Sequence, residues 1–165
     1  PGYAAGDQYV DPDIAVLYAA VGDWNDPNRA RDLALNMYNR GTTAIMSITG
    51  GGDPGVHRAA SETGRFAIAV NTDQNAMMPG VILGSVLKRL DNSIYRVVEA
   101  AMDGTLPYGT NETAGVKEGA ISIADDQLYR DLVPQSTRDA LEEVMEGIAS
   151  GSIDLQALLS AELAD

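Results

Sequence analysis

The chain has 165 residues, of which 45% are hydrophobic and 21% charged, a composition typical of one globular domain. Its formal net charge of −13 argues against nucleic-acid binding, because affinity for phosphate backbones comes from lysine and arginine. The sequence has no cysteine and one histidine, which excludes disulfides, thiol catalysis, thiolate metal sites and metal sites built from several histidines. No apolar stretch approaches the roughly 20 residues that a membrane-spanning helix needs.

The first 74 residues predict strands and helices in alternation. After a short helix over residues 3–10, each apolar run is typical of a strand buried on both faces, and a polar turn follows it. The predicted strands are residues 14–21, 43–48 and 66–70, and the helices that follow the first two are residues 29–38 and 56–63. Asn25 and Asp26 supply a cap for the first of these helices, and Pro27 a favourable first residue. This alternation predicts an α/β fold with a doubly wound parallel sheet.

After residue 74 the regular alternation of strands and helices ends. The expected elements are a strand over residues 81–87, an amphipathic helix over residues 93–102 capped by Asp91, a strand over residues 116–124, a helix after Pro134 and a peripheral helical tail over residues 150–165. No internal repeat or low-complexity tract interrupts them.

The three predicted strands of the first part end in polar or glycine-rich turns. Because the carboxyl ends of parallel strands meet at one edge of a sheet, where open α/β proteins bind ligands, these turns are expected to converge. They contain Asp23, Trp24 and Asn25 in the first turn, residues 50–53 in the second and residues 71–74 in the third. This convergence is the pattern that points most directly to function.

Two residues near these turns have two interpretations each. Trp24, the only tryptophan, can fold back as a lid on the core or serve as a flat platform for a ligand. Lys88 can be an ordinary surface residue, or a polar anchor that faces the acidic turns and holds a ligand.

Other kinds of chemistry have weaker support. The glycine-rich turn over residues 49–55 can cradle a phosphate or simply let the backbone pass close to a ligand, and it lacks both the Walker lysine and the dinucleotide-binding spacing. His57 is expected to be a solvated surface residue, since no partners at a recognisable spacing complete a catalytic triad. Four aspartates can group around a metal or act as an acid–base pair: Asp23, Asp26, Asp53 and Asp73. Three of the four precede helices, however, where carboxylates are expected as caps.

Six short motifs follow one another in an order that resembles the basic membrane protein family, the nucleoside-binding type of substrate-binding protein that serves ABC importers. They are YAAG at 3–6, VGDWNDP at 21–27, GGG at 50–52, VNTDQ at 70–74, VLKR at 86–89 and VKEG at 116–119. The resemblance covers essentially the whole chain.

The resemblance implies a type I periplasmic-binding-protein fold, in which two α/β lobes enclose a ligand cleft. Members of the family are about twice as long, and this chain resembles their C-terminal half. Residues 1–74 would supply most of the second lobe, residues 75–110 a crossover segment that belongs to the first lobe, and residues 111–165 the return to the second lobe with the C-terminal helices. The strand over residues 81–87 would then lack its natural neighbours.

The resemblance also implies roles for five residues. Trp24 would stack on a purine base, Gly50 would lie close to the ligand, and Lys88 would face it. Asn71 and Asp73 occupy the positions at which the family has two aspartates that bind ribose hydroxyls. Asn71 departs from that pattern, and an amide offers one acceptor oxygen where a carboxylate offers two.

The function implied is that of an extracytoplasmic receptor of an ABC importer, periplasmic or lipid-anchored at the outer face of the cell membrane. Its expected partners are a purine nucleoside or a related small ligand, the transporter permease and the missing N-terminal half of the same protein. We expect no cofactor, no metal and no catalysis, because no nucleophile–base pair is present. The alternatives are a nucleotide- or sugar-processing enzyme that uses Asp73 and Lys88, and a ligand-sensing module without a transporter.

Overall fold

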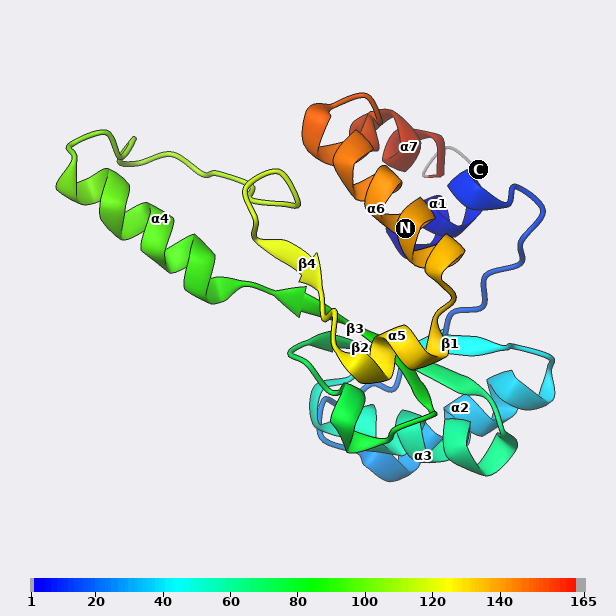
Figure 1. The fold of residues 1–165 in the computed structure, drawn as a ribbon. Helices are drawn as coiled ribbons and strands as arrows, with labels where there is room; N and C mark the ends of the chain where they lie inside the picture. The colour runs from blue at the N-terminus through cyan, green and yellow to red at the C-terminus, as the bar shows by residue number, and fades with distance from the viewer. Residues whose placement is uncertain (1, 163–165) are drawn as a thin grey trace.

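The computed structural model describes residues 2–162, within which a four-stranded mixed sheet forms the centre of an α/β fold (Figure 1). The strands are β1 (Ala44–Met46), β2 (Phe66–Asn71), β3 (Ile82–Lys88) and β4 (Ile121–Ile123). They lie in the order β1-β2-β3-β4; the first three are parallel, and β4 pairs antiparallel with β3. The parallel α/β arrangement expected from the sequence is therefore confirmed.

Helices surround this sheet unevenly. They are α1 (Gly2–Val10), α2 (Pro27–Asn39), α3 (Asp53–Thr63), α4 (Leu90–Met102), α5 (Gln127–Leu132), α6 (Gln135–Ser150) and α7 (Leu155–Glu162), with 3₁₀ turns η1 (Gly50–Gly52) and η2 (Asn75–Met77). In Figure 1, α2 and α3 lie together against one side of the sheet, whereas α6 and α7 form a separate group with α1. Of the predicted tail, residues 163–165 lie outside the described residues.

The core between α2, α3 and the sheet is built mainly from small side chains. Its buried members are Val21, Ala30, Ala34, Tyr38, Ile45, Val56, Ala59, Ala60 and Ala67. Alanines allow close packing of the two helices, and at Gly55 a Cβ atom would lie 1.9 Å from the carbonyl oxygen of Pro27.

Local end signals place the helices where the sequence predicts them. The side chain of Asp26 accepts a hydrogen bond from the backbone N–H of Arg29 at 2.9 Å, and Pro27 is the first residue of α2. Helix α3 ends at Gly64, which adopts a left-handed conformation with φ of 62°. Helix α6 begins directly after Pro134.

The prediction of a strand over residues 14–21 is wrong. Residues 14–20 lie outside the sheet, and Tyr18 is 90% exposed. Strands β1 and β2 pair directly with each other, and their ladder continues with a 3.0 Å hydrogen bond from Ser47 N to Ile68 O. Strand β1 is at the end of the described sheet, and residues 14–21 do not pair with its outer edge. An apolar run becomes a strand only where a neighbour can complete its hydrogen bonds.

Two further elements differ from their predicted form. Residues 116–119 form a turn before β4, because Gly119 has φ of 66° and the Glu118 carboxylate accepts the N–H of Gly115 at 2.7 Å. Asp91 does not cap α4: the helix begins at Leu90, and Asp91 forms an ion pair with Arg89 at 2.7 Å.

Strand β3 does not lack neighbours, contrary to expectation. It pairs with β2 on one side and with β4 on the other, so it belongs to the same sheet as β1 and β2. The element that extends away from the rest is α4 (Figure 1). The division of the chain between two lobes stays a prediction.

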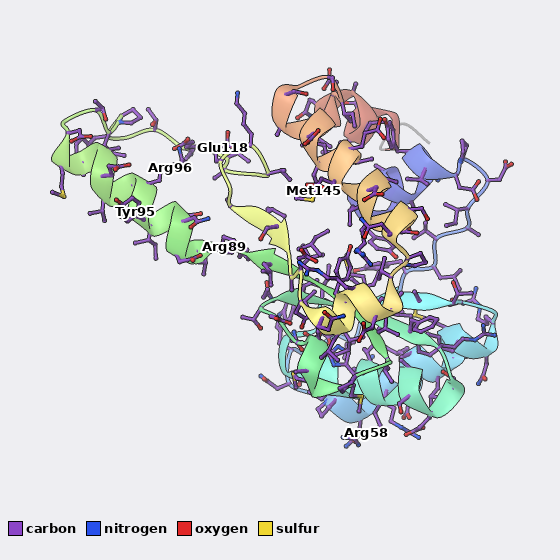
Figure 2. All side chains as sticks on the ribbon, viewed as in Figure 1. Arg58, Arg89, Tyr95, Arg96, Glu118 and Met145 are labelled. Carbon is purple, nitrogen blue, oxygen red and sulfur yellow. The ribbon has the colours of Figure 1, made fainter. Side chains whose placement is uncertain are left out.

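The apolar side of α4 faces solvent. The exposed fractions are 64% for Ile94, 70% for Tyr95 and 83% for Met102, whereas Arg96 on the other side forms an ion pair with Glu112 at 2.9 Å. Tyr95 and Arg96 are labelled in Figure 2. Across the described residues, every helix is too short or too polar to cross a membrane.

Candidate ligand-binding site

The turns that follow β1 and β2 meet the end of β3 at one edge of the sheet. The three strands are parallel, and Asn71 at the end of β2 lies opposite Leu87, the residue before Lys88. The structure therefore brings the second turn, the third turn and Lys88 to the same edge, where ligands bind in open α/β sheets.

The loop that contains Trp24 packs on the glycine turn η1. A Cβ atom at Gly50 would lie 3.3 Å from the carbonyl oxygen of Trp24 and 3.5 Å from its ring atom Cε3, and a Cβ atom at Gly51 would lie 2.8 Å from Asn25 Oδ1. Larger side chains would push the loop away, which explains the consecutive glycines. Trp24 itself is 67% exposed, and this exposure disfavours its interpretation as a lid on the core.

The buried carboxylate of Asp53 holds the start of the glycine turn in place. Asp53 is 4% exposed, and its Oδ1 accepts hydrogen bonds from the backbone N–H of Thr49 at 2.8 Å and from the Thr49 hydroxyl at 2.7 Å. These bonds hold the residue before Gly50, whose φ is 62°. The glycines at positions 50 and 51 allow the close approach of the loop that contains Trp24.

His57 is buried, not solvated as the sequence predicts. Only 1% of its surface is exposed, and its Nε2 lies 3.3 Å from the hydroxyl of Ser47 at the end of β1. Burial lowers the pKa of His57 below its usual value, and nearby Asp53 partly opposes this shift. The imidazole is therefore a neutral part of the support beneath the second turn.

Stability should therefore decrease as the pH falls from about 7.5 to about 5.5. Below the usual histidine pKa of 6.5, His57 takes up a proton in the unfolded chain before it does so in the folded one, and this difference favours unfolding. Urea unfolding at the two pH values measures the effect. The His57→Gln variant, which leaves no histidine in the chain, should show a smaller difference; an unchanged pH dependence would contradict a buried neutral imidazole.

The third turn begins with a strained backbone. Asn71 has φ of 76°, and no other non-glycine residue between residues 2 and 162 has a positive φ. Asparagine and aspartate tolerate this left-handed conformation better than most residues, so either the family's aspartate or Asn71 fits here. Both Asn71 and Asp73 are exposed, and Oδ1 of Asp73 accepts the N–H of Asn75 at 3.0 Å.

The four aspartates that could have formed a metal or acid–base cluster are used separately. Asp26 caps α2, Asp53 binds Thr49, and the carboxylates of Asp23 and Asp73 each accept a backbone N–H two residues further on. Within residues 2–162, no three potential metal ligands of the histidine, cysteine or carboxylate type come together.

A hollow of about 660 Å³ lies between β4, α5 and α6, and none of the five predicted site residues lines it. Each of these five residues is exposed to solvent: Trp24, Gly50, Asn71, Asp73 and Lys88. Sequence reasoning did not anticipate the support beneath the second turn, because Asp53 and His57 are polar residues with no local sign of burial. Ser47 lies in a predicted buried strand, but its contact with His57 is visible only in the structure.

This fold is the fold of ABC solute-binding proteins. A crystal structure of an ABC transporter solute-binding protein from Aeropyrum pernix K1 superposes with a TM-score of 0.76 at 20% identity, over 92% of this chain and 51% of that one. The structure titled a transcriptional activator of the comK gene from Bacillus halodurans also has a TM-score of 0.76, at 21% identity, over 90% of this chain and 50% of that one.

The chain belongs to the Bmp family of PnrA-like ABC transporter substrate-binding proteins, whose profile matches residues 1–154. It is 31% identical to basic membrane protein D of Borreliella burgdorferi (strain JD1), over 74% of this chain and 37% of that protein. It is 24% identical to the ABC transporter nucleoside-binding protein BmpA of Lactococcus lactis subsp. cremoris (strain MG1363), over 92% of this chain and 47% of that protein. The chain thus spans less than half the length of these relatives.

Two expectations are confirmed by this membership. The family is the one that the six motifs resemble, and its members are substrate-binding proteins of ABC transporters, not enzymes.

Proposed function

We propose that this chain forms one wall of a cleft that binds a purine nucleoside or a closely related solute for an ABC importer. The observation that carries the proposal is the exposed ring of Trp24, which the glycine turn supports at the edge where the parallel strands end. A flat aromatic surface suits a purine base, because stacking buries both faces in contact and leaves the edges of the base free for hydrogen bonds.

The polar residues along the same edge suit the sugar. Asp73 and Asn71 offer exposed oxygens that can accept hydrogen bonds from ribose hydroxyls, and Lys88 offers a donor at the end of β3. The name of the Lactococcus lactis relative, a nucleoside-binding protein, supports the same ligand class.

The second wall would come from a first lobe, as the resemblance implies. The apolar side of α4, with Ile94 and Tyr95 exposed, is a surface that such a lobe would cover, and the greater length of the relatives supports it. In this arrangement the receptor acts outside the cytoplasm, free in a periplasm or anchored by lipid at the outer face of the membrane. It delivers its ligand to a permease.

Incubation of the purified protein with adenosine, guanosine or inosine tests the proposal. We expect at least one nucleoside to raise the melting temperature, because a ligand that binds only the folded state stabilises it. Chromatography should recover the nucleoside unchanged. Release of a free base or a phosphorylated product would instead favour the processing enzyme, and no thermal shift with any nucleoside would contradict the ligand class.

A further inference from the structure

Two fully buried polar side chains lie directly behind the third turn. Asn75 is 1% exposed and Ser85, in the middle of β3, is 0% exposed. The Ser85 hydroxyl donates to Asn75 Oδ1 at 2.7 Å and accepts the backbone N–H of Gln74 at 3.0 Å. The Asn75 amide group donates to Asp126 Oδ1 at 3.2 Å.

This network joins three segments that are distant in the sequence. Gln74 and Asn75 belong to the third turn, Ser85 to β3, and Asp126 is the N-cap of α5, whose side chain also accepts the N–H of Tyr129 at 2.8 Å. A backbone hydrogen bond of 2.9 Å from Ala124 N to Ser85 O adds a second link between β3 and the segment after β4. The third turn is thus held from two sides.

The network reaches the candidate site through one carboxylate. The backbone N–H of Asn75 donates to Asp73 Oδ1 at 3.0 Å, so the orientation of Asp73 depends on the position of Asn75. Only this oxygen has a protein donor within the described residues, which leaves Oδ2 for another partner. The Gln74 amide group donates to Val70 O at 3.0 Å and closes the turn on the strand that precedes it.

Burial of an amide and a hydroxyl is costly unless their hydrogen bonds are made, and an apolar pair of similar size would fill the space without that requirement. A satisfied network instead selects one geometry for the groups attached to it. We propose that Ser85 and Asn75 are positioning residues that aim the Asp73 carboxylate at the hydroxyl groups of the bound ligand. The inference rests on the proposed function, which makes Asp73 a ligand-binding residue.

Ser85→Ala tests the proposal, with nucleoside affinity measured by titration of Trp24 fluorescence. The variant removes the acceptor for Gln74 N–H and the donor to Asn75, and we expect about tenfold weaker binding. Tyr38→Phe is the matched control. It also removes a buried hydroxyl, which donates to Phe66 O at 2.7 Å, but at the opposite end of β2, so affinity should be unchanged. Equal losses in both variants would overturn the proposal.

A double-mutant cycle separates positioning from general support of the fold. If Ser85 acts through Asp73, Ser85→Ala should cost little further affinity once Asp73→Ala is present. The same tenfold loss in the Asp73→Ala background would show that Ser85 acts in another way. Asn75→Ala replaces Ser85→Ala in the same cycle if the serine variant fails to fold.

Amide hydrogen exchange tests the positioning without a ligand. Exchange at Gln74 and Asn75 should accelerate in Ser85→Ala by at least about tenfold, while amides of α2 and α3 remain as slow as in the wild-type protein. Unchanged exchange in the turn would overturn the positioning role. If the wild-type protein binds no nucleoside, the proposed function fails, and this exchange measurement alone decides whether the network holds the turn.

Discussion

Gly55→Ala is expected to lower the free energy of unfolding by about 3 kcal/mol or more, at or above the upper end of the range for atoms added to a packed core. A Cβ atom there would lie 1.9 Å from Pro27 O, 2.8 Å from Pro27 C and 3.0 Å from Arg31 N. All three are backbone atoms of α2, so no side-chain rotation can relieve the overlap. Helices α2 and α3 must separate, and Pro27 directly follows the loop that carries Trp24.

Gly6→Ala provides the control. Position 6 lies in α1 and is exposed, and a Cβ atom added there would have no neighbouring atom within 4 Å, so alanine should be neutral or stabilising by up to about 1 kcal/mol. Denaturant unfolding of both variants measures the difference. A Gly55→Ala protein as stable as Gly6→Ala would mean that the two helices are not in close contact.

The elements that the sequence predicts well are those whose local and tertiary requirements agree. Asp26 and Pro27 start a helix by local chemistry, and Gly64 ends one by its left-handed conformation. Strand β2 is both strongly apolar and central enough to find partners on each side. The convergence of the second and third turns then follows from parallel strands alone, whereas the turn that contains Trp24 follows no strand and lies there because it packs on η1.

The predictions that fail depend on neighbours distant in the sequence. Residues 14–20 are as apolar as β2, but they do not pair with β1, the strand at the end of the sheet, so their backbone has no ladder neighbour. His57 occupies the first turns of a helix, where solvent exposure is common, and only its contact with Ser47 reveals that this face is buried. Ser85 and Asn75 likewise have ordinary polar side chains whose burial depends on β3, α5 and the third turn together.

The candidate site divides in the same way. Trp24 could be located because it is the only tryptophan and follows an apolar run, and the glycine turn because it has three consecutive glycines. The left-handed backbone at Asn71 depends instead on how β2 ends. The residues that face solvent at the sheet edge were accessible to sequence reasoning, and the buried residues that orient them were not. The exposed residues of the candidate site can therefore be recognised as sequence motifs. The buried residues that support them can be recognised only in the three-dimensional structure.

Trp24→Ala should weaken nucleoside binding about 10- to 100-fold, the range expected for loss of one base–aromatic stack. Its effect on the free energy of unfolding should stay within about 0.5 kcal/mol, because the side chain is 67% exposed and few core contacts are lost. Trp24→Ala should thus reduce affinity and leave stability nearly unchanged. Tyr38→Phe, which removes a buried hydrogen bond to Phe66 O, should instead reduce stability and leave affinity unchanged. Isothermal titration measures the affinity without relying on the removed fluorophore.

Trp24→Phe makes the test specific for stacking. A smaller aromatic ring keeps a flat surface, so the variant should retain more affinity than Trp24→Ala for a purine nucleoside. Free ribose, which has no base to stack, should bind the three proteins equally. If Trp24→Ala binds nucleosides as tightly as the wild-type protein, the ring is not the platform, and the exposed tryptophan would need another partner at the same edge of the sheet.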